Sequence, residues 1–82
     1  MPHVIAACSS CRSFTDGVST FNLRASTVRQ MIAELEGLHP GLGVHVRDRM
    51  AIAIDGEIFQ DAEDQPLADD SEIVLIPRIG GG

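Results

Sequence analysis

One apolar stripe constrains the fold more than any other feature of this sequence. Within residues 26–36, apolar residues recur at the spacing of one face of an α-helix. They are Val28, Met31, Ile32 and Leu35. A helix with a single apolar face is stable only when that face packs on another apolar layer. The rest of the chain must therefore supply that layer.

The expected ends of this helix carry capping and terminating residues. Thr27 and Gln30 have the spacing of a capping box, in which a hydroxyl and an amide satisfy backbone donors at the start of a helix. Gly37, followed by Pro40-Gly41, is expected to end the helix. The sequence therefore predicts one main helix, with its packing layer formed by the segments on either side.

Five segments have the composition of β-strands. They are residues 3–8, 18–23, 50–54, 57–60 and 72–76. Two Asp-Gly pairs, at 16–17 and 55–56, are turn sequences that should join the first two strands and the third and fourth strands as antiparallel hairpins. The polar residues 9–17 and the acidic residues 61–70 should be mainly loops.

The order of these elements is strand, strand, helix, strand, short strand, strand. A right-handed crossover can place the first and last strands side by side in parallel. One helix then covers one face of a mixed four- or five-stranded sheet, which is the β-grasp (ubiquitin-like) arrangement of the α+β class. We assign residues 1–77 to a β-grasp domain and residues 78–82 to a flexible C-terminal tail.

Composition and charge narrow the classes of function. The 82 residues include 12 acidic and 6 basic side chains, with a formal net charge of −6. This balance disfavours binding to nucleic acid or to an anionic membrane surface. The sequence has no apolar run of the ~18 residues that a membrane span needs, and its first residues lack the basic and apolar blocks of a signal peptide. We therefore expect a single-domain cytoplasmic protein.

Cys8 and Cys11 form a CxxC pair. Structural zinc sites use four ligands, and a redox-active CxxC usually opens a helix, whereas this pair follows a predicted strand. Both thiols should be reduced in the cytoplasm. We predict no metal site.

Five stretches of the sequence share the order and spacing of a known family. They are residues 11–17 (CRSFTDG), 26–35 (STVRQMIAEL) with 39–42 (HPGL), 52–57 (IAIDGE), 66–73 (PLADDSEI) and 77–82 (PRIGGG). Together they resemble the MoaD/ThiS family of ubiquitin-like sulfur carrier proteins, and most closely the MoaD-type small subunit of molybdopterin synthase. Each motif alone has low specificity, but the set spans nearly the whole chain.

The resemblance implies a carrier whose chemistry takes place at its C-terminal glycine. An E1-like adenylating enzyme of the MoeB/ThiF type would use ATP to adenylate Gly82, and a sulfur donor would then form a thiocarboxylate. Gly80 and Gly81 would give clearance inside a narrow partner channel, because they lack side chains. The chain would bind no cofactor and would be the non-catalytic partner of a larger MoaE-type subunit. Cys11 replaces an apolar family residue, which implies a core position.

The partner-binding surface should be the sheet face opposite the helix. Side chains alternate along a strand, so if Ile73 and Leu75 face the helix, their neighbours face outward. The same alternation applies to residues 50–54. The predicted partner-binding residues are Ala51, Ala53, Val74, Ile76, Arg78 and Ile79.

Three other functions stay open. The chain could carry sulfur for thiamine, cysteine or secondary-metabolite biosynthesis, or it could be a ubiquitin-like modifier joined through Gly82 to lysines of other proteins. A non-covalent β-grasp adaptor or a CxxC metal or redox protein is the third alternative. Deletion of residues 81–82 should abolish the carrier and modifier functions and leave the third alternative unaffected.

Overall fold

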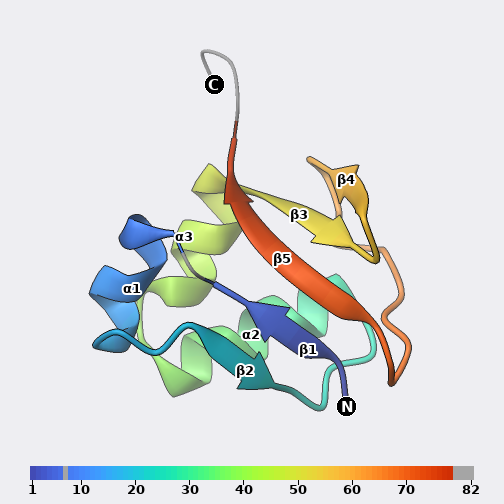
Figure 1. The fold of residues 1–82 in the computed structure, drawn as a ribbon, viewed down its shortest axis with the longest axis horizontal. Helices are drawn as coiled ribbons and strands as arrows, with labels where there is room; N and C mark the ends of the chain where they lie inside the picture. The colour runs from blue at the N-terminus through green and yellow to red at the C-terminus, as the bar shows by residue number, and fades with distance from the viewer. Residues whose placement is uncertain (7, 79–82) are drawn as a thin grey trace.

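The computed structural model of the chain describes residues 1–6 and 8–78, and in that part it has five strands and three helices. In chain order they are β1 (His3–Ile5), α1 (Ser9–Thr15), β2 (Thr20–Asn22), α2 (Val28–Leu38), α3 (Leu42–Arg49), β3 (Met50–Ile54), β4 (Glu57–Phe59) and β5 (Glu72–Pro77). The strands form one sheet in the order β2-β1-β5-β3-β4 (Figure 1). β1 is parallel to β5, and the other three pairings are antiparallel. The predicted mixed sheet and the parallel pairing of its first and last strands are confirmed.

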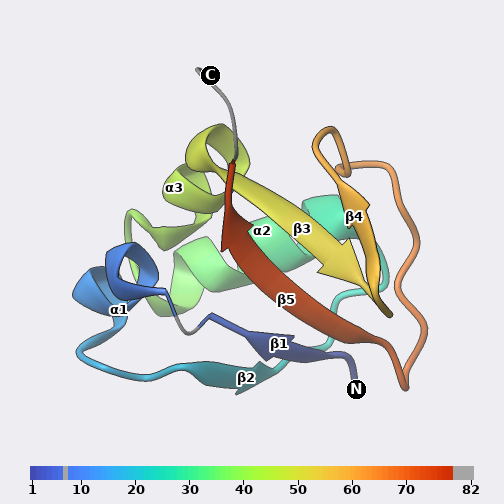
Figure 2. The same cartoon turned by 45° about the horizontal axis from the view of Figure 1, so that its top comes forward.

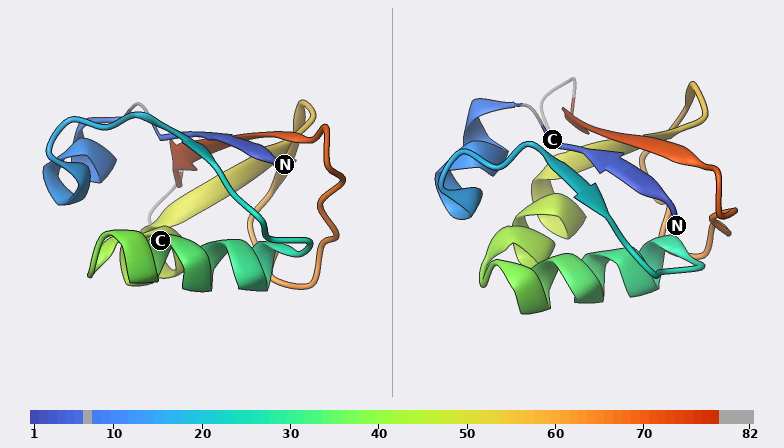
Figure 3. Two further views of the ribbon diagram at one scale, coloured as in Figure 1. Left: turned by 90° about the horizontal axis from the view of Figure 1, so that it is seen from below. Right: turned by 60° about the horizontal axis from the view of Figure 1, so that its bottom comes forward.

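Helix α2 covers one face of this sheet, and its predicted apolar stripe supplies the contact. Val28, Met31 and Leu35 are fully buried in a core shared with side chains of β1, β3 and β5, while Ile32 is partly buried against it. Each buried side chain of this size contributes about 1.5–3 kcal/mol. The sheet and α2 form two layers (Figure 3), and none of the described helices lies over the other sheet face. Within the described residues, each helix is too short or too polar to cross a membrane.

The predicted capping box at the start of α2 is present with one change of partner. The Thr27 hydroxyl accepts a hydrogen bond from the Gln30 backbone N–H at 3.2 Å. The side-chain oxygen of Gln30 accepts a hydrogen bond from the backbone N–H of Ser26 at 2.9 Å. The return bond therefore reaches Ser26, one residue before the N-cap Thr27, and it holds the chain that enters the helix.

The segment between β1 and β2 is a helix, so the prediction of a polar loop there is wrong. Helix α1 buries Cys11 and Thr15, which lie four residues apart on one face. It ends at Asp16, whose backbone is left-handed with φ of 53°. Burial of one face outweighs the weak helix propensity of this serine-rich segment. The flanking strands are shorter than predicted, since β1 ends at Ile5 and β2 spans Thr20–Asn22.

A third helix, α3, also corrects the prediction of one main helix. Pro40-Gly41 does follow the end of α2, but Gly41, with φ of 96°, is also the N-cap of α3. Leu42 and Val46 lie four residues apart in α3 and are fully buried. The helix packs against α1 and α2 beside the sheet (Figure 2). Gly37 lies inside α2, contrary to the prediction that it helps to end the helix, and the C-cap of α2 is His39.

Glu36 joins α2 to α3. Its carboxylate accepts hydrogen bonds from the backbone N–H groups of Gly41 at 2.8 Å and Val44 at 3.1 Å. These bonds satisfy donors at the start of α3 and hold the pKa of Glu36 below its ordinary value. The two helices cross closely at Gly43. A Cβ added to this residue would lie only 2.5 Å from the carbonyl oxygen of Ile32.

Candidate partner-binding surface

Strand β5 lies at the centre of the sheet, between β1 and β3, and it leads to the predicted tail. Its side chains alternate as expected. Ile73 and Leu75 are buried in the core, while Val74 and Ile76 are partly exposed on the face opposite α2. Because β5 is hydrogen-bonded along both edges, the strand that carries the tail is held from both sides.

Apolar side chains line up across four strands on this face, and we call them the open-face apolar row. The strand register aligns Ile5 with Val74, and Val74 with Ala53. It also aligns Ala53 with Ile58, whose side chain is the most exposed, at 61%. Neighbouring strands lie about 4.8 Å apart, so these four side chains form one continuous apolar surface. Ile76 adjoins the row on the side where β5 ends.

Ala51 is the exception among the predicted surface residues. It pairs with Ile76 in the sheet and so belongs to the same face, yet it is only 4% exposed. A methyl group is too short to project past larger neighbouring side chains. The expectation that Ala51 is exposed toward a partner is therefore wrong, while Ala53 is partly exposed.

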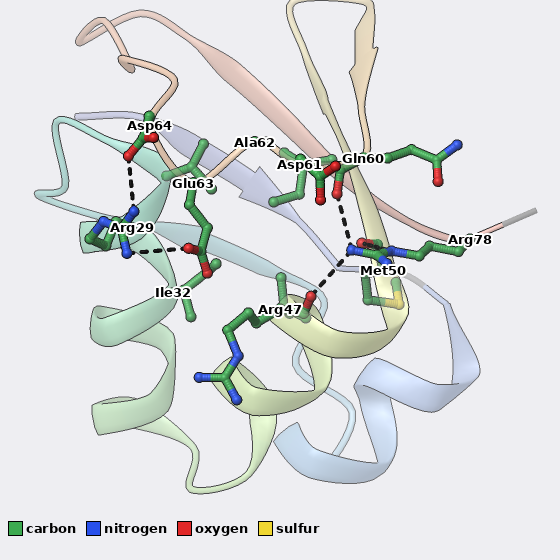
Figure 4. A pocket seen from close by; sticks show the side chains of 13 residues that line it. Arg29, Ile32, Arg47, Met50, Gln60, Asp61, Ala62, Glu63, Asp64 and Arg78 are labelled. Atoms are coloured by element: carbon green, nitrogen blue, oxygen red, sulfur yellow. Dashed lines mark hydrogen bonds and ion pairs between the residues drawn. The ribbon is translucent and has the colours of Figure 1, made fainter. Parts of the chain in front are cut away.

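The sequence predicts Arg78 at the edge of this surface. In the structure its guanidinium forms hydrogen bonds to backbone carbonyl oxygens of the folded domain. Its Nη2 donates hydrogen bonds to the carbonyl oxygens of Gln60 at 3.0 Å and Arg47 at 3.4 Å (Figure 4). Its Nε donates to the carbonyl oxygen of Met50 at 3.2 Å. Its backbone N–H donates to the carbonyl oxygen of Arg49 at 3.3 Å. This Arg78 clamp ties the first residue of the predicted tail to the end of α3 and to the segment after β4.

The remaining tail residues of the prediction are Ile79, Gly80, Gly81 and Gly82, and they lie outside the described residues. The structure therefore describes the point at which the tail leaves the domain, which we call the base of the tail, and the surface beside it. The base is formed by the end of β5 and by the Arg78 clamp.

An open pocket of about 310 Å³ lies beside the Arg78 clamp, between α2, α3 and residues 60–64. Its rim carries charges of both signs (Figure 4). Arg29 forms ion pairs with Glu63 at 3.2 Å and with Asp64 at 2.9 Å. These exposed pairs contribute little to stability.

The CxxC pair opens helix α1, contrary to the prediction that it merely follows a strand. Cys8 is the N-cap residue of α1, and Cys11 lies in its first turn. Cys11 is fully buried, as the family resemblance implied, while Cys8 is partly exposed. Among the described residues, no three His, Cys, Asp or Glu side chains are grouped so that they could hold a metal ion.

Two members of the open-face apolar row, Ile5 and Ile58, were missed by the sequence reasoning. Both could have been found from the predicted strand pairings. The two-residue turn at 55–56 sets the hairpin register and so places Ile58 opposite Ala53. The parallel pairing of the first and last strands places Ile5 beside Val74.

A five-stranded mixed sheet of this order, with the main helix on one face, is a ubiquitin-like β-grasp fold. Residues 12–82 match the model of the ThiS family, so the chain belongs to the ThiS family. No curated protein sequence matches the chain.

Three solved structures share the fold. A chain of the Amycolatopsis orientalis BexX/CysO complex has 17% identity and a TM-score of 0.83, with 100% of both chains covered. Mycobacterium tuberculosis CysO, described as an antigen, has 18% identity and a TM-score of 0.83, covering 96% of this chain and 100% of that one. SAMP1 from Haloferax volcanii has 20% identity and a TM-score of 0.72, covering 99% and 98%. At these identities the likeness establishes the fold.

Proposed function

We propose that this protein is a sulfur carrier. An E1-like enzyme of the MoeB/ThiF type adenylates the carboxylate of Gly82 with ATP, and a sulfur donor converts the adenylate to a thiocarboxylate. The sulfur then passes to a larger MoaE-type subunit in molybdopterin biosynthesis, in the cytoplasm. The chain supplies the reacting carboxylate, holds no cofactor and contributes no catalytic side chain.

The position of β5 is the observation that supports this proposal most. The strand is paired on both sides, and it ends beside the open-face apolar row. Four residues follow Arg78 in the sequence, and a fully extended segment of that length reaches roughly 14 Å. A partner seated on the row can therefore receive Gly82 in its active site while the domain stays outside.

The row can also offset the free-energy cost of ordering the tail. Fixing four residues costs about 4–8 kcal/mol at about 1–2 kcal/mol of backbone entropy each. Complete burial of an exposed isoleucine returns about 1.5–3 kcal/mol. Ile58 would give most of that amount, and the partly exposed side chains of the row would each give less. Burial of the row by a partner thus offsets part of the free-energy cost of ordering the tail.

The charges around the row indicate the chemistry of the partner surface. Glu72 lies on the same face as Val74, at the end of β5 away from the tail. The chain as a whole carries a net charge of −6. The complementary surface should have an apolar centre and basic residues near Glu72, since opposite charges speed the encounter and set its orientation.

The test is the intact mass of the protein after incubation with an E1-like adenylating enzyme, ATP and sulfide, which displaces AMP from the adenylate. Exchange of one oxygen for sulfur at the unhindered terminal glycine adds about 16 Da. The variant that lacks residues 81–82 is the matched control and should gain no mass. An unchanged mass of the full chain, under conditions that convert another carrier with the same enzymes, would contradict the proposal.

A second mass measurement, in a cell lysate, separates the proposed function from its main alternative. In a cell lysate supplemented with ATP, a protein modifier gives a ladder of conjugates of higher mass that depend on Gly82. A carrier gives the single thiocarboxylate species. Addition of the larger MoaE-type subunit together with the molybdopterin precursor that accepts the sulfur should then restore the original mass, with water supplying the oxygen of the carboxylate.

A further inference from the structure

A hydrogen-bonded cluster of nucleophilic side chains lies where α1 meets α3, apart from the open-face apolar row. The Sγ of Cys8 lies 3.3 Å from the Oγ of Ser10. That hydroxyl oxygen lies 3.0 Å from the Nε2 of His45, which belongs to α3. The ring of Phe14 packs against the His45 ring with centroids 5.2 Å apart. The thiol is thus connected through a hydroxyl to a positioned imidazole.

The two thiols of the CxxC pair have opposite properties. Cys8 is partly exposed, and Cys11 is fully buried. Burial alone would raise the pKa of Cys8, but hydrogen bonds from Ser10 and Cys11 outweigh it and lower that pKa below the ordinary value. Burial raises the pKa of Cys11 to about 12, and the neighbouring Cys8 raises it as well. Cys8 is therefore the thiol that ionises and that solvent can reach.

The pair also has the geometry of a closable disulfide. The backbone N–H of Arg12 donates to the carbonyl oxygen of Cys8 at 3.1 Å, so the CxxC segment forms one helical turn. The rise and radius of an α-helix place Cα atoms three residues apart about 5 Å from each other, and disulfides bridge Cα atoms about 4.4–6.8 Å apart. Each of the two thiols shifts the pKa of the other, as groups close together in space do. Closure needs side-chain rotation and little backbone movement.

We propose that Cys8 and Cys11 are a redox-active dithiol, in which exposed Cys8 attacks a low-molecular-weight disulfide and buried Cys11 resolves the mixed disulfide. In the tautomer with a proton on Nε2, His45 donates to Ser10, and the Ser10 hydroxyl is then free to donate to the Cys8 thiolate and stabilise it. This activity is separate from the chemistry proposed for Gly82.

The exchange has two steps. The Cys8 thiolate, whose proton goes to solvent, attacks one sulfur of the small disulfide and expels the other as a thiolate. Cys11 then loses its proton and attacks the Cys8 sulfur, which breaks the mixed disulfide and expels the second small thiolate. Two cysteine thiols are oxidised by two electrons, and the small disulfide is reduced to two thiols that take up the two protons.

The experiment uses the wild-type chain in mixtures of glutathione and glutathione disulfide, quenched in acid and analysed by intact mass. We expect the protein to lose two hydrogen atoms, to carry no glutathione at equilibrium and, after unfolding in denaturant, to resist iodoacetamide at both cysteines. Accumulation of a stable glutathione adduct on the wild-type chain, or two freely alkylated cysteines in glutathione disulfide, would overturn the proposal.

Variants assign the two roles. Cys11→Ser should trap one glutathione on Cys8, whereas Cys8→Ser should react at least tenfold more slowly than wild type, because the remaining thiol is buried. Equal reactivity of the two single variants would refute the assignment of Cys8 as the attacking thiol.

A matched serine pair tests the hydrogen-bond chain. Ser10→Ala should slow alkylation of Cys8 by about fivefold, the effect of one hydrogen bond to the thiolate. Ser13→Ala is the control, because the Ser13 hydroxyl on the same helix donates to the carbonyl oxygen of Ser10 at 2.7 Å and does not contact the thiol. Equal rates in the two variants would remove Ser10 and His45 from the mechanism.

Discussion

The guanidinium of Arg78 donates a hydrogen bond of 3.0 Å to the backbone carbonyl oxygen of Gln60, so the residue that begins the tail is bonded to the segment after β4. We expect Arg78→Ala to lower the free energy of unfolding by about 1 kcal/mol, since the bonds of one partly exposed side chain are lost. Exchange of the residue 78 amide with solvent should become severalfold faster, which NMR can measure.

The neighbouring Arg49→Ala is the control for the Arg78 substitution, because it removes the same charge. It should leave amide exchange at residue 78 unchanged. The Arg78 variant should also need a higher carrier concentration for half-maximal activation by the adenylating enzyme, since the base of the tail is no longer held. Identical exchange and activation in both variants would show that the Arg78 clamp does not fix the tail.

Alanine substitutions at two glycines should change the free energy of unfolding in opposite directions. A Cβ at Gly43 would meet the carbonyl oxygen of Ile32 at 2.5 Å, whereas a Cβ at Gly37 in α2 meets nothing within 4 Å. We expect Gly43→Ala to destabilise the fold by about 1–3 kcal/mol through overpacking. Gly37→Ala should stabilise it by up to about 1 kcal/mol through helix propensity. Chemical denaturation of both variants at one pH measures the difference.

Ile58 and Val44 test the location of the partner-binding surface. Both are exposed apolar residues, at 61% and 46%, but Ile58 belongs to the open-face apolar row and Val44 to α3. Ile58→Asp should weaken activation by the adenylating enzyme at least tenfold, because binding would bury a charge. Val44→Asp should leave it unchanged. Both variants should keep melting temperatures close to that of wild type, and equal activation by the two would exclude the row as the docking site.

Glu36 should make the stability of the fold depend on pH in the acidic range. Hydrogen bonds from the backbone of Gly41 and Val44 hold its pKa below the ordinary value in the folded chain. A lowered folded pKa means that the stabilisation is fully present above the unfolded pKa of about 4.3 and is lost as the pH falls through the folded pKa. Glu36→Gln should therefore melt at a lower temperature than wild type at pH 7. The difference should shrink toward pH 3, and a constant difference would contradict the capping role.

The strands and α2 could be predicted because their signals are local. The apolar stripe of α2, the capping residue Thr27 and the Asp-Gly turn at 55–56 each act within a few residues. The alternation along β5 likewise separated Ile73 from Val74. These patterns also gave the sheet face on which the candidate surface lies.

The other two helices could not be predicted because they are short and depend on tertiary contacts. Helix α1 has 7 residues and buries two of them, Cys11 and Thr15. Helix α3 is capped by Glu36, a residue of another helix, which no local pattern reveals. The burial of Ala51 and the bonding of Arg78 likewise depend on neighbours distant in the sequence.

The central place of β5 has a consequence for synthesis on the ribosome. The first strand to emerge, β1, pairs in parallel with the last, and β3 pairs with the same last strand. A nascent chain that lacks β5 has no centre for its sheet, and the β1–β2 hairpin alone is at best marginally stable. The fold can close only after translation has passed Pro77, immediately before the tail. Chains truncated before the end of β5 should therefore stay open to proteolysis.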